Sequence, residues 1–181
     1  MPLLSTAIYK KIETQANKLL KDHKVDSPPV SVERIAKSIG VDVIPYEMGN
    51  EISGILVLNE GKGTIGYNPS QSKTRQRFTI SHELGHFVLH AHSQKELFVD
   101  KDFIVKFRSK KTYSRAEIIH ESEANAFAAA LLMPKEFIMK ELYKKKNQDL
   151  TETELIEELA RAFDVSIPAM TYRLSDLNVF V

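Results

Sequence analysis

The stretch "FTISHELGHFVLHAH", from Phe78 to His92, holds four of the six histidines of the chain. Two of them, His82 and His86, enclose a glutamate in the pattern HExxH. Residues four apart lie on one face of a helix, so the two imidazoles can bind one ion. Glu83 is offset by one position and can reach a water on that ion without binding the ion itself. The pattern predicts a metal-binding helix with His82 and His86 as ligands and Glu83 as catalytic base.

Metal and base together would hydrolyse a peptide bond. Zn²⁺ lowers the pKa of a bound water from about 16 to about 7. Glu83 would take the proton from that water and pass it to the leaving amine. The alternative is a chance match in an ordinary helix. Gly85 disfavours chance, because glycine inside a helix costs about 1 kcal/mol relative to alanine, and a close approach by another segment would explain it.

The third ligand has two candidates. His92 follows His86 by six residues, as in the pattern HExxHxxGxxH, in which a midway glycine lets the chain turn back. This sequence has Leu89 at the glycine position. On a continuing helix His92 would point away from the face that bears His82, so we disfavour it.

The second candidate is a carboxylate on the next helix, which offers Glu117, Glu121 and Glu123. Glu121 and Asn125 are four apart and share a face. The glutamate would bind the metal, and the asparagine would accept the other N–H of a ligand histidine. Glu123 points about 200° away from Glu121, so both cannot be ligands of one ion.

The composition is that of an ordinary globular protein. The chain has 181 residues, which predicts one domain, 1–181, with N-terminal helices in 1–40, a sheet plus active-site helices in 41–134 and a C-terminal helical module in 135–181. The net charge of +1 neither favours nor disfavours nucleic acid. There is no cysteine, so histidine and carboxylate side chains must hold any metal.

The sequence carries no sign of export or membrane insertion. The first residues lack the basic and then apolar layout of a signal peptide. The most apolar run, "ANAFAAALLM", is too short to span a bilayer. We therefore expect a cytoplasmic protein without a membrane partner.

The order of helical and strand-like segments predicts an α+β fold. Three segments rich in β-branched residues, "VDVIPYE", "ISGILVL" and "GTIGYN", predict a small three-stranded, mainly antiparallel sheet packed on helices. Capping boxes at Ser114 to Glu117 and Thr151 to Glu154 mark two helix starts. The expected helices cover about residues 5–22, 32–39, 70–90, 114–134, 134–146, 151–163 and 167 onward.

The paired motifs "RFTISHELGHFVLH" and "EANAFAAALLMP" resemble the ImmA/IrrE family of bacterial and phage metallopeptidases. Weaker likeness extends the resemblance over roughly residues 30–177. It implies a zincin-like metallopeptidase core of the gluzincin type. In such a core His82, His86 and Glu121 are metal ligands and Glu83 is the catalytic base.

The resemblance also implies a biological role. Family members typically cleave a helix-turn-helix repressor, so we expect a metal-dependent endopeptidase that acts on such a repressor of a phage, mobile element or stress response. Zn²⁺ suits two histidines and a glutamate best, with Mn²⁺ or Fe²⁺ as alternatives. The other function considered is a non-hydrolytic regulator that binds a repressor or DNA and uses a structural metal. Glu83 favours the enzyme, because a structural site has no use for a base.

The C-terminal segment "ELARAFDVSIPAMTYRLSDL" has the outline of a helix-turn-helix. Its second helix offers only Arg173 as a basic residue, and the helix before it is rich in glutamate. Glutamates would repel phosphates. We therefore expect a packed helical module that helps to dock the substrate protein, with nucleic acid not a direct partner.

Other residues near the motif have expected roles around the metal site. His90 lies one turn beyond His86, and we expect it beside the metal site without binding the ion. The strand "GTIGYN" precedes the motif helix, and we expect its edge to pair with an extended substrate. The chemistry also needs a donor for the oxyanion. The candidates are His120, Tyr113, Tyr172 and Arg173.

Overall fold

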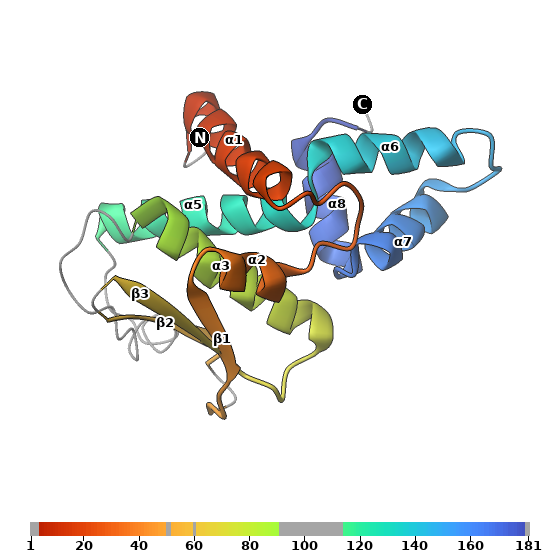
Figure 1. Cartoon of the computed structure of the whole chain (residues 1–181). Helices are drawn as coiled ribbons and strands as arrows, with labels where there is room; N and C mark the ends of the chain where they lie inside the picture. Colours follow the sequence, from red (N-terminus) through yellow and green to blue (C-terminus); the bar gives the residue numbers. More distant parts are fainter. Residues whose placement is uncertain (1–3, 50–51, 60, 91–113, 180–181) are drawn as a thin grey trace.

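The computed structural model describes residues 4–49, 52–59, 61–90 and 114–179 (Figure 1). The helices in these ranges are α1 (Thr6–Asp22), α2 (Val32–Ser38), α3 (Lys73–His90), α5 (Arg115–Leu132), α6 (Lys135–Lys145), α7 (Glu152–Phe163) and α8 (Ile167–Asp176). The strands are β1 (Val41–Pro45), β2 (Gly54–Asn59) and β3 (Lys62–Tyr67). The expected α+β class is confirmed. None of the described helices has the length and apolar character needed to cross a bilayer.

Both predicted capping boxes are present. The Ser114 side chain accepts the backbone N–H of Glu117, whose carboxylate accepts the N–H of Ser114 in return, and α5 starts at the next residue. Thr151 and Glu154 do the same at the start of α7. These local hydrogen bonds satisfy backbone donors that have no partner within the helix, which is why the starts could be found from sequence.

The three-stranded sheet has the order β1-β3-β2. Strands β2 and β3 form an antiparallel hairpin in which Leu56 lies opposite Ile65. Strand β1 pairs with the other side of β3 in parallel, with Val43 opposite Ile65. The sheet is therefore mixed, and the antiparallel expectation holds for the hairpin alone. The physical reason is topological, because the chain passes from β1 across to β2 before it returns as the central strand.

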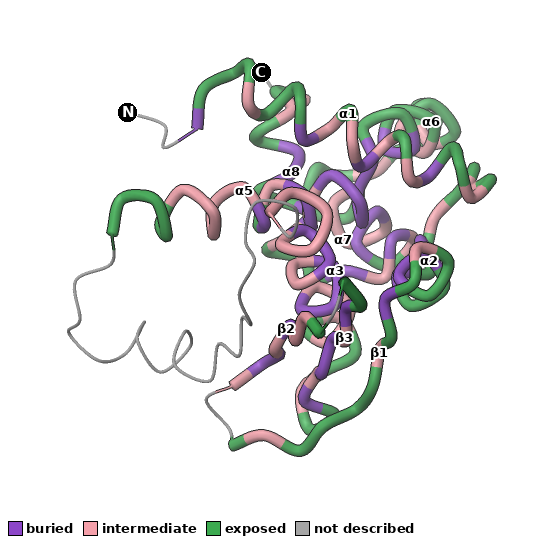
Figure 2. Tube along the Cα trace, turned by 60° about the vertical axis from the view of Figure 1, so that its left-hand side comes forward, coloured by how far each residue is buried: buried purple, intermediate pink, exposed green. Residues whose placement is uncertain are grey.

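The helix α3 lies at the centre of the molecule (Figure 1). The sheet packs on one side of it, α5 packs on the other, and α1 covers α5. Buried segments gather around the central helices, and exposed segments lie toward the outside of the molecule (Figure 2). Ile80 and Leu84 of α3 and Phe127 and Leu131 of α5 are at most 1% exposed.

Helices α3 and α5 touch at Gly85. A Cβ atom added there would lie 3.1 Å from Cδ1 of Phe127 and 3.2 Å from both Cα and the carbonyl oxygen of Ala124. The glycine therefore lets the two backbones approach more closely than side chains allow. The sequence argument expected a close neighbour at Gly85, and that neighbour is α5.

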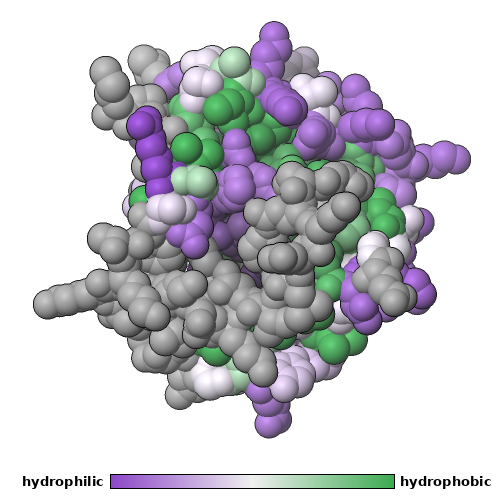
Figure 3. Space-filling view, turned by 90° about the vertical axis from the view of Figure 1, so that its left-hand side faces the viewer, coloured by the Kyte–Doolittle hydropathy of each residue, from purple (hydrophilic) through white to green (hydrophobic). Residues whose placement is uncertain are grey.

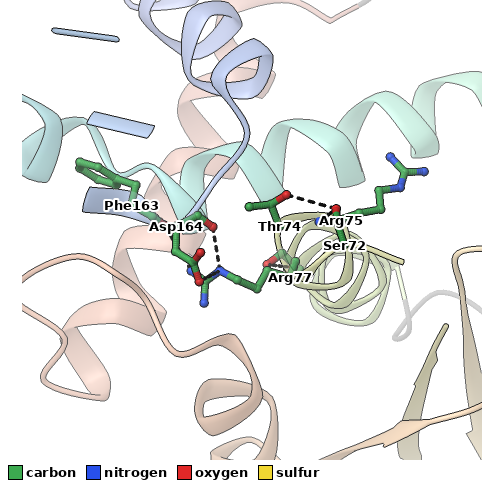
Figure 4. A network of polar contacts seen from close by, with 7 residues as sticks. Ser72, Thr74, Arg75, Arg77, Phe163 and Asp164 are labelled. Carbon is green, nitrogen blue, oxygen red and sulfur yellow. Dashed lines mark hydrogen bonds and ion pairs between the residues drawn. The ribbon is translucent and has the colours of Figure 1, made fainter. Parts of the chain in front are cut away.

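The C-terminal helices α7 and α8 are tied to α3 through the turn between them (Figure 4). Asp164 ends α7 in a left-handed conformation with φ of 52°. Arg77 of α3 donates from Nε to the Asp164 carbonyl oxygen at 3.0 Å and from Nη2 to that of Phe163 at 3.4 Å. Its Nε also lies 3.3 Å from the Asp164 carboxylate. The helix-turn-helix outline is therefore attached to the helix that carries HExxH.

Arg173 is a buried link within the fold and not a free basic residue. Its Nε donates to the Met133 carbonyl oxygen at 3.0 Å, and its Nη2 lies 2.6 Å from Oε1 of Glu13. It connects α8, the end of α5 and α1. The expectation that Arg173 could donate to an oxyanion is wrong, because these contacts hold its guanidinium inside the structure.

We expect Gly85→Val to destabilise the protein by about 1 to 3 kcal/mol, because its side chain must enter the tight contact with Ala124 and Phe127. Urea unfolding of the metal-free protein measures the loss. Gly49→Val is the matched control, since an added Cβ at Gly49 meets nothing within 4 Å. A Gly85→Val protein as stable as the parent would show that α3 and α5 do not depend on this contact.

Candidate metal centre

Helices α3 and α5 bring His82, His86 and Glu121 together. Nε2 of His86 lies 2.7 Å from Oε1 of Glu121, and Nε2 of His82 lies 3.3 Å from Oε2. The two Nε2 atoms are 3.1 Å apart. In a tetrahedral zinc site with ligands at about 2.0 to 2.2 Å, neighbouring ligand atoms lie roughly 3.3 to 3.6 Å apart. A divalent ion therefore fits among these three donors after small side-chain shifts.

Asn125 orients the first of these histidines. Its Oδ1 lies 3.0 Å from Nδ1 of His82 and accepts the proton on that nitrogen. With that proton on Nδ1, the metal-binding form of His82 can direct the lone pair of Nε2 toward His86 and Glu121. This is the arrangement expected from the spacing of Glu121 and Asn125 on one face of α5, and partners of this kind tune ligand histidines.

The charges of the cluster shift its pKa values in opposite directions. Burial disfavours ionised Glu121, but hydrogen bonds from His82 and His86 and their charges outweigh burial and lower its pKa to about 2. Burial also disfavours charged His82. The hydrogen bond to Glu121 and the nearby charge of Glu83 outweigh that effect and raise the pKa of His82 above 6.5. In the metal-free protein these contacts favour the protonated form of His82.

Glu83 lies against the start of strand β2. A Cβ atom added to Gly54, the first residue of β2, would lie 3.6 Å from Cγ of Glu83 and would overlap Cγ2 of Thr79. The strand thus starts directly against the HExxH helix. Sequence reasoning missed Gly54, although a glycine inside a strand pattern is a known sign of close backbone approach.

The strand "GTIGYN" does not have a free edge. Its residues form β3, which is hydrogen-bonded to β1 on one side and to β2 on the other. The expectation that this strand offers its edge to substrate is therefore wrong. Among the described residues the sheet edges belong to β1 and β2, and β2 is the edge that borders Glu83.

His90 lies beside His86, with ring centroids 5.7 Å apart, and belongs to a second cluster with His120 and Glu123. Its ring stacks on that of His120 with centroids 4.2 Å apart, and its Nε2 lies 3.5 Å from Oε2 of Glu123. Burial, together with the charges of His120 and His86, lowers the pKa of His90 to about 4. Glu123 is kept away from Glu121, as helix geometry predicted. Sequence reasoning did not anticipate that Glu123 would meet His90.

The three residues of the first cluster remain accessible to solvent. The side chains of His82, His86 and Glu121 keep 15%, 22% and 12% of their surface exposed. Figure 3 views the molecule from the side where α3 ends and α5 begins, and hydrophilic and hydrophobic side chains lie next to one another on this face. Water can therefore reach the site.

Two of the remaining oxyanion candidates lie within the described residues. His120 stacks on His90 and is part of the second cluster. Tyr172 is 75% exposed on α8. Tyr113 and the alternative ligand His92 lie outside the described residues.

The chain is similar to a known family and to individual known proteins. The sequence model of the Peptidase_M78 family, described as the IrrE N-terminal-like domain, matches residues 36–175. "Uncharacterized immunity region protein 2" of Bacillus phage phi105 is 28% identical over 134 residues, which are 74% of this chain and 75% of that protein. A solved structure of a Mycobacterium tuberculosis transcriptional regulator matches with a TM-score of 0.64 and 15% identity. That match covers 92% of this chain but only 46% of the regulator, and it shows a common fold alone.

We expect Glu121→Gln to lower the pKa of His82 in the metal-free protein, because the variant removes the carboxylate that raises it. NMR titration of the histidine rings in the presence of a chelator measures the change. The raised pKa stabilises the parent fold below pH 6.5, and this gain is lost as the pH rises through the folded-state pKa.

Glu123→Gln is the matched control, since Glu123 lies beside His90 and not beside His82. It should leave the titration of His82 unchanged. If the two variants titrate alike at His82, the carboxylate of Glu121 does not set its pKa.

Proposed function

This chain belongs to the Peptidase_M78 family of IrrE N-terminal-like domains, and from that premise we propose that it is a zinc-dependent endopeptidase that cleaves a regulatory protein. The observation that carries the proposal is the convergence of His82, His86 and Glu121, with Glu83 beside them on α3. Two histidines and a glutamate with a free fourth position are typical of catalytic zinc sites. Mn²⁺ or Fe²⁺ could take the same donors.

The chain supplies the proton transfers that peptide hydrolysis needs. When bound, the zinc ion would polarise the peptide carbonyl and lower the pKa of the attacking water. Glu83 is the base that takes the proton of this water and returns it to the leaving amine. Asn125 holds the ring of His82 in the orientation that directs Nε2 to the ion.

Strand β2 is the proposed binding edge for the substrate. It pairs with β3 on one side only, within the part of the chain that the structure describes. Its Gly54 end lies against the helix of Glu83. An extended peptide that adds to the outer edge of β2 would form main-chain hydrogen bonds beside the catalytic base.

The proposed substrate is a helix-turn-helix repressor of a phage, mobile element or stress response. The phage relative belongs by name to an immunity region, and the solved structure of similar fold is named a transcriptional regulator. A repressor substrate places the activity in the cytoplasm. The whole chain, 1–181, would form the peptidase, with α7 and α8 as a docking module coupled to α3 through Arg77 and Asp164.

The second candidate function is a non-hydrolytic regulator that binds a repressor or DNA and uses the metal for structure. The name of the Mycobacterium tuberculosis protein is the observation that favours it. The buried pairing of Arg173 with Glu13 weakens the DNA version, because it removes a basic residue from the second helix of the module. The two functions differ in whether Glu83 is needed.

We expect Glu121→Ala to lower the affinity of the tightest zinc equivalent more than Asn125→Ala does. Glu121 is a proposed ligand, whereas loss of an orienting partner such as Asn125 costs about 10- to 100-fold in affinity. Competition with a chromophoric chelator measures both constants. His92→Ala is the control and should bind like the parent. Loss of zinc in His92→Ala alone would make His92 the third ligand.

We expect Glu83→Gln to keep its zinc and its fold while the cleavage rate falls about 10²- to 10⁴-fold, because only proton transfer is removed. The measurement is mass spectrometry of purified candidate repressors after incubation with either protein, alongside zinc content. If Glu83→Gln cleaves as fast as the parent, the assignment of the base is wrong. If the parent cleaves none yet both proteins bind a repressor equally, the regulator is the better description.

A further inference from the structure

Three potential metal donors at the end of α3 have no part in the proposed mechanism. They are His90 on α3 and His120 and Glu123 on α5. One donor atom from each lies within 4.8 Å of the other two. The side chains of His90 and Glu123 are only 12% and 19% exposed. The protein therefore holds a second group of two imidazoles and a carboxylate in a partly buried position.

Helix periodicity separates this group from the first. His90 follows His86 by four residues, so it continues the row of histidines along α3 by one more turn. On α5, His120 and Glu123 are three apart and share a face, whereas Glu121 is rotated by about 100° from His120. The two groups share no residue, and the His86 and His90 rings lie 5.7 Å apart between centroids.

The geometry suits a cation better than it suits a simple contact between helices. The rings of His90 and His120 stack at 4.2 Å, so their nitrogen atoms are close to one another and to the same carboxylate. A divalent ion could use a donor from each of the three side chains at once. Nε2 of His90 lies 3.5 Å from Oε2 of Glu123, a separation that matches the spacing of ligand atoms around a tetrahedral ion.

The donor types restrict which ion would bind. Ca²⁺ and Mg²⁺ prefer sites made of oxygen atoms. Imidazole together with one carboxylate favours a transition-metal ion such as Zn²⁺ or Co²⁺.

We propose that His90, His120 and Glu123 form a second binding site for a divalent transition-metal ion, next to the site of His82, His86 and Glu121. The looser spacing of the second group implies weaker binding, so this site fills after the first as the metal concentration rises. Its ion would join the last turn of α3 to the first half of α5. The proposal does not depend on peptidase activity, since both sites are defined by their donors alone.

The test is the binding stoichiometry of the chelator-stripped full chain. Isothermal titration with Zn²⁺, and metal analysis after dialysis at fixed free Zn²⁺, should give two equivalents for the parent. Glu123→Gln and His120→Asn should each weaken the second equivalent by more than about 10-fold and retain the first. Glu121→Ala should lose the tighter equivalent instead. Glu136→Gln, at an exposed carboxylate in the first turn of α6, is the matched control and should bind two equivalents.

NMR of the parent keeps the proposal testable if a variant does not fold. The ring signals of His90 and His120 should shift during addition of the second equivalent and not the first. A parent that binds one equivalent overturns the proposal. Binding of a second Zn²⁺ equivalent with unchanged affinity by both Glu123→Gln and His120→Asn also overturns it. The same holds if the ring signals of His90 and His120 do not shift when the parent binds its second equivalent. A parent protein that binds two equivalents of Zn²⁺ but cleaves no candidate repressor would contradict the proposed peptidase function and leave the second metal site standing.

Discussion

The contact between α3 and α5 at Gly85 is the constraint on which the rest of the site depends. The missing side chain lets the α3 backbone approach within van der Waals distance of Ala124 and Phe127. At that separation the carboxylate of Glu121 reaches both imidazoles of HExxH, with the shorter distance 2.7 Å. If α3 and α5 were further apart, the Glu121 carboxylate could not reach the histidines, because the length of a glutamate side chain is fixed.

The same helix pair brings together two groups of histidine and glutamate side chains. Residues that alternate around α5 face α3 on two sides of the line of contact. Glu121 and Asn125 meet His82 and His86 on one side, and His120 and Glu123 meet His90 on the other. In this partly buried setting the two histidines of HExxH lower the pKa of Glu121, and Glu121 raises the pKa of His82.

Contacts with the sheet, with α5 and with the turn after α7 hold α3, and with it the site, in place. Arg77 fixes its N-terminal half to the turn after α7, and the sheet packs along its length. The Gly54 end of β2 is positioned against Glu83 by the same packing. A site supported by helices and strands keeps its groups closer to productive geometry than one carried by loops. The C-terminal module is part of this support, because the turn between α7 and α8 binds Arg77 of α3.

The sequence by itself determined the features that depend on neighbours along one helix. HExxH, the shared face of Glu121 and Asn125, and the capping boxes all follow from spacings of three or four residues. Only the tertiary structure decided that β3 is the central strand, that Arg173 is paired with Glu13, and that Glu123 meets His90. Those features join segments far apart in the chain, and no local periodicity reports which segments pack together. Gly85 shows both kinds of information. The sequence shows that a glycine there destabilises the isolated helix, and the tertiary structure shows that Ala124 and Phe127 of α5 pack against it.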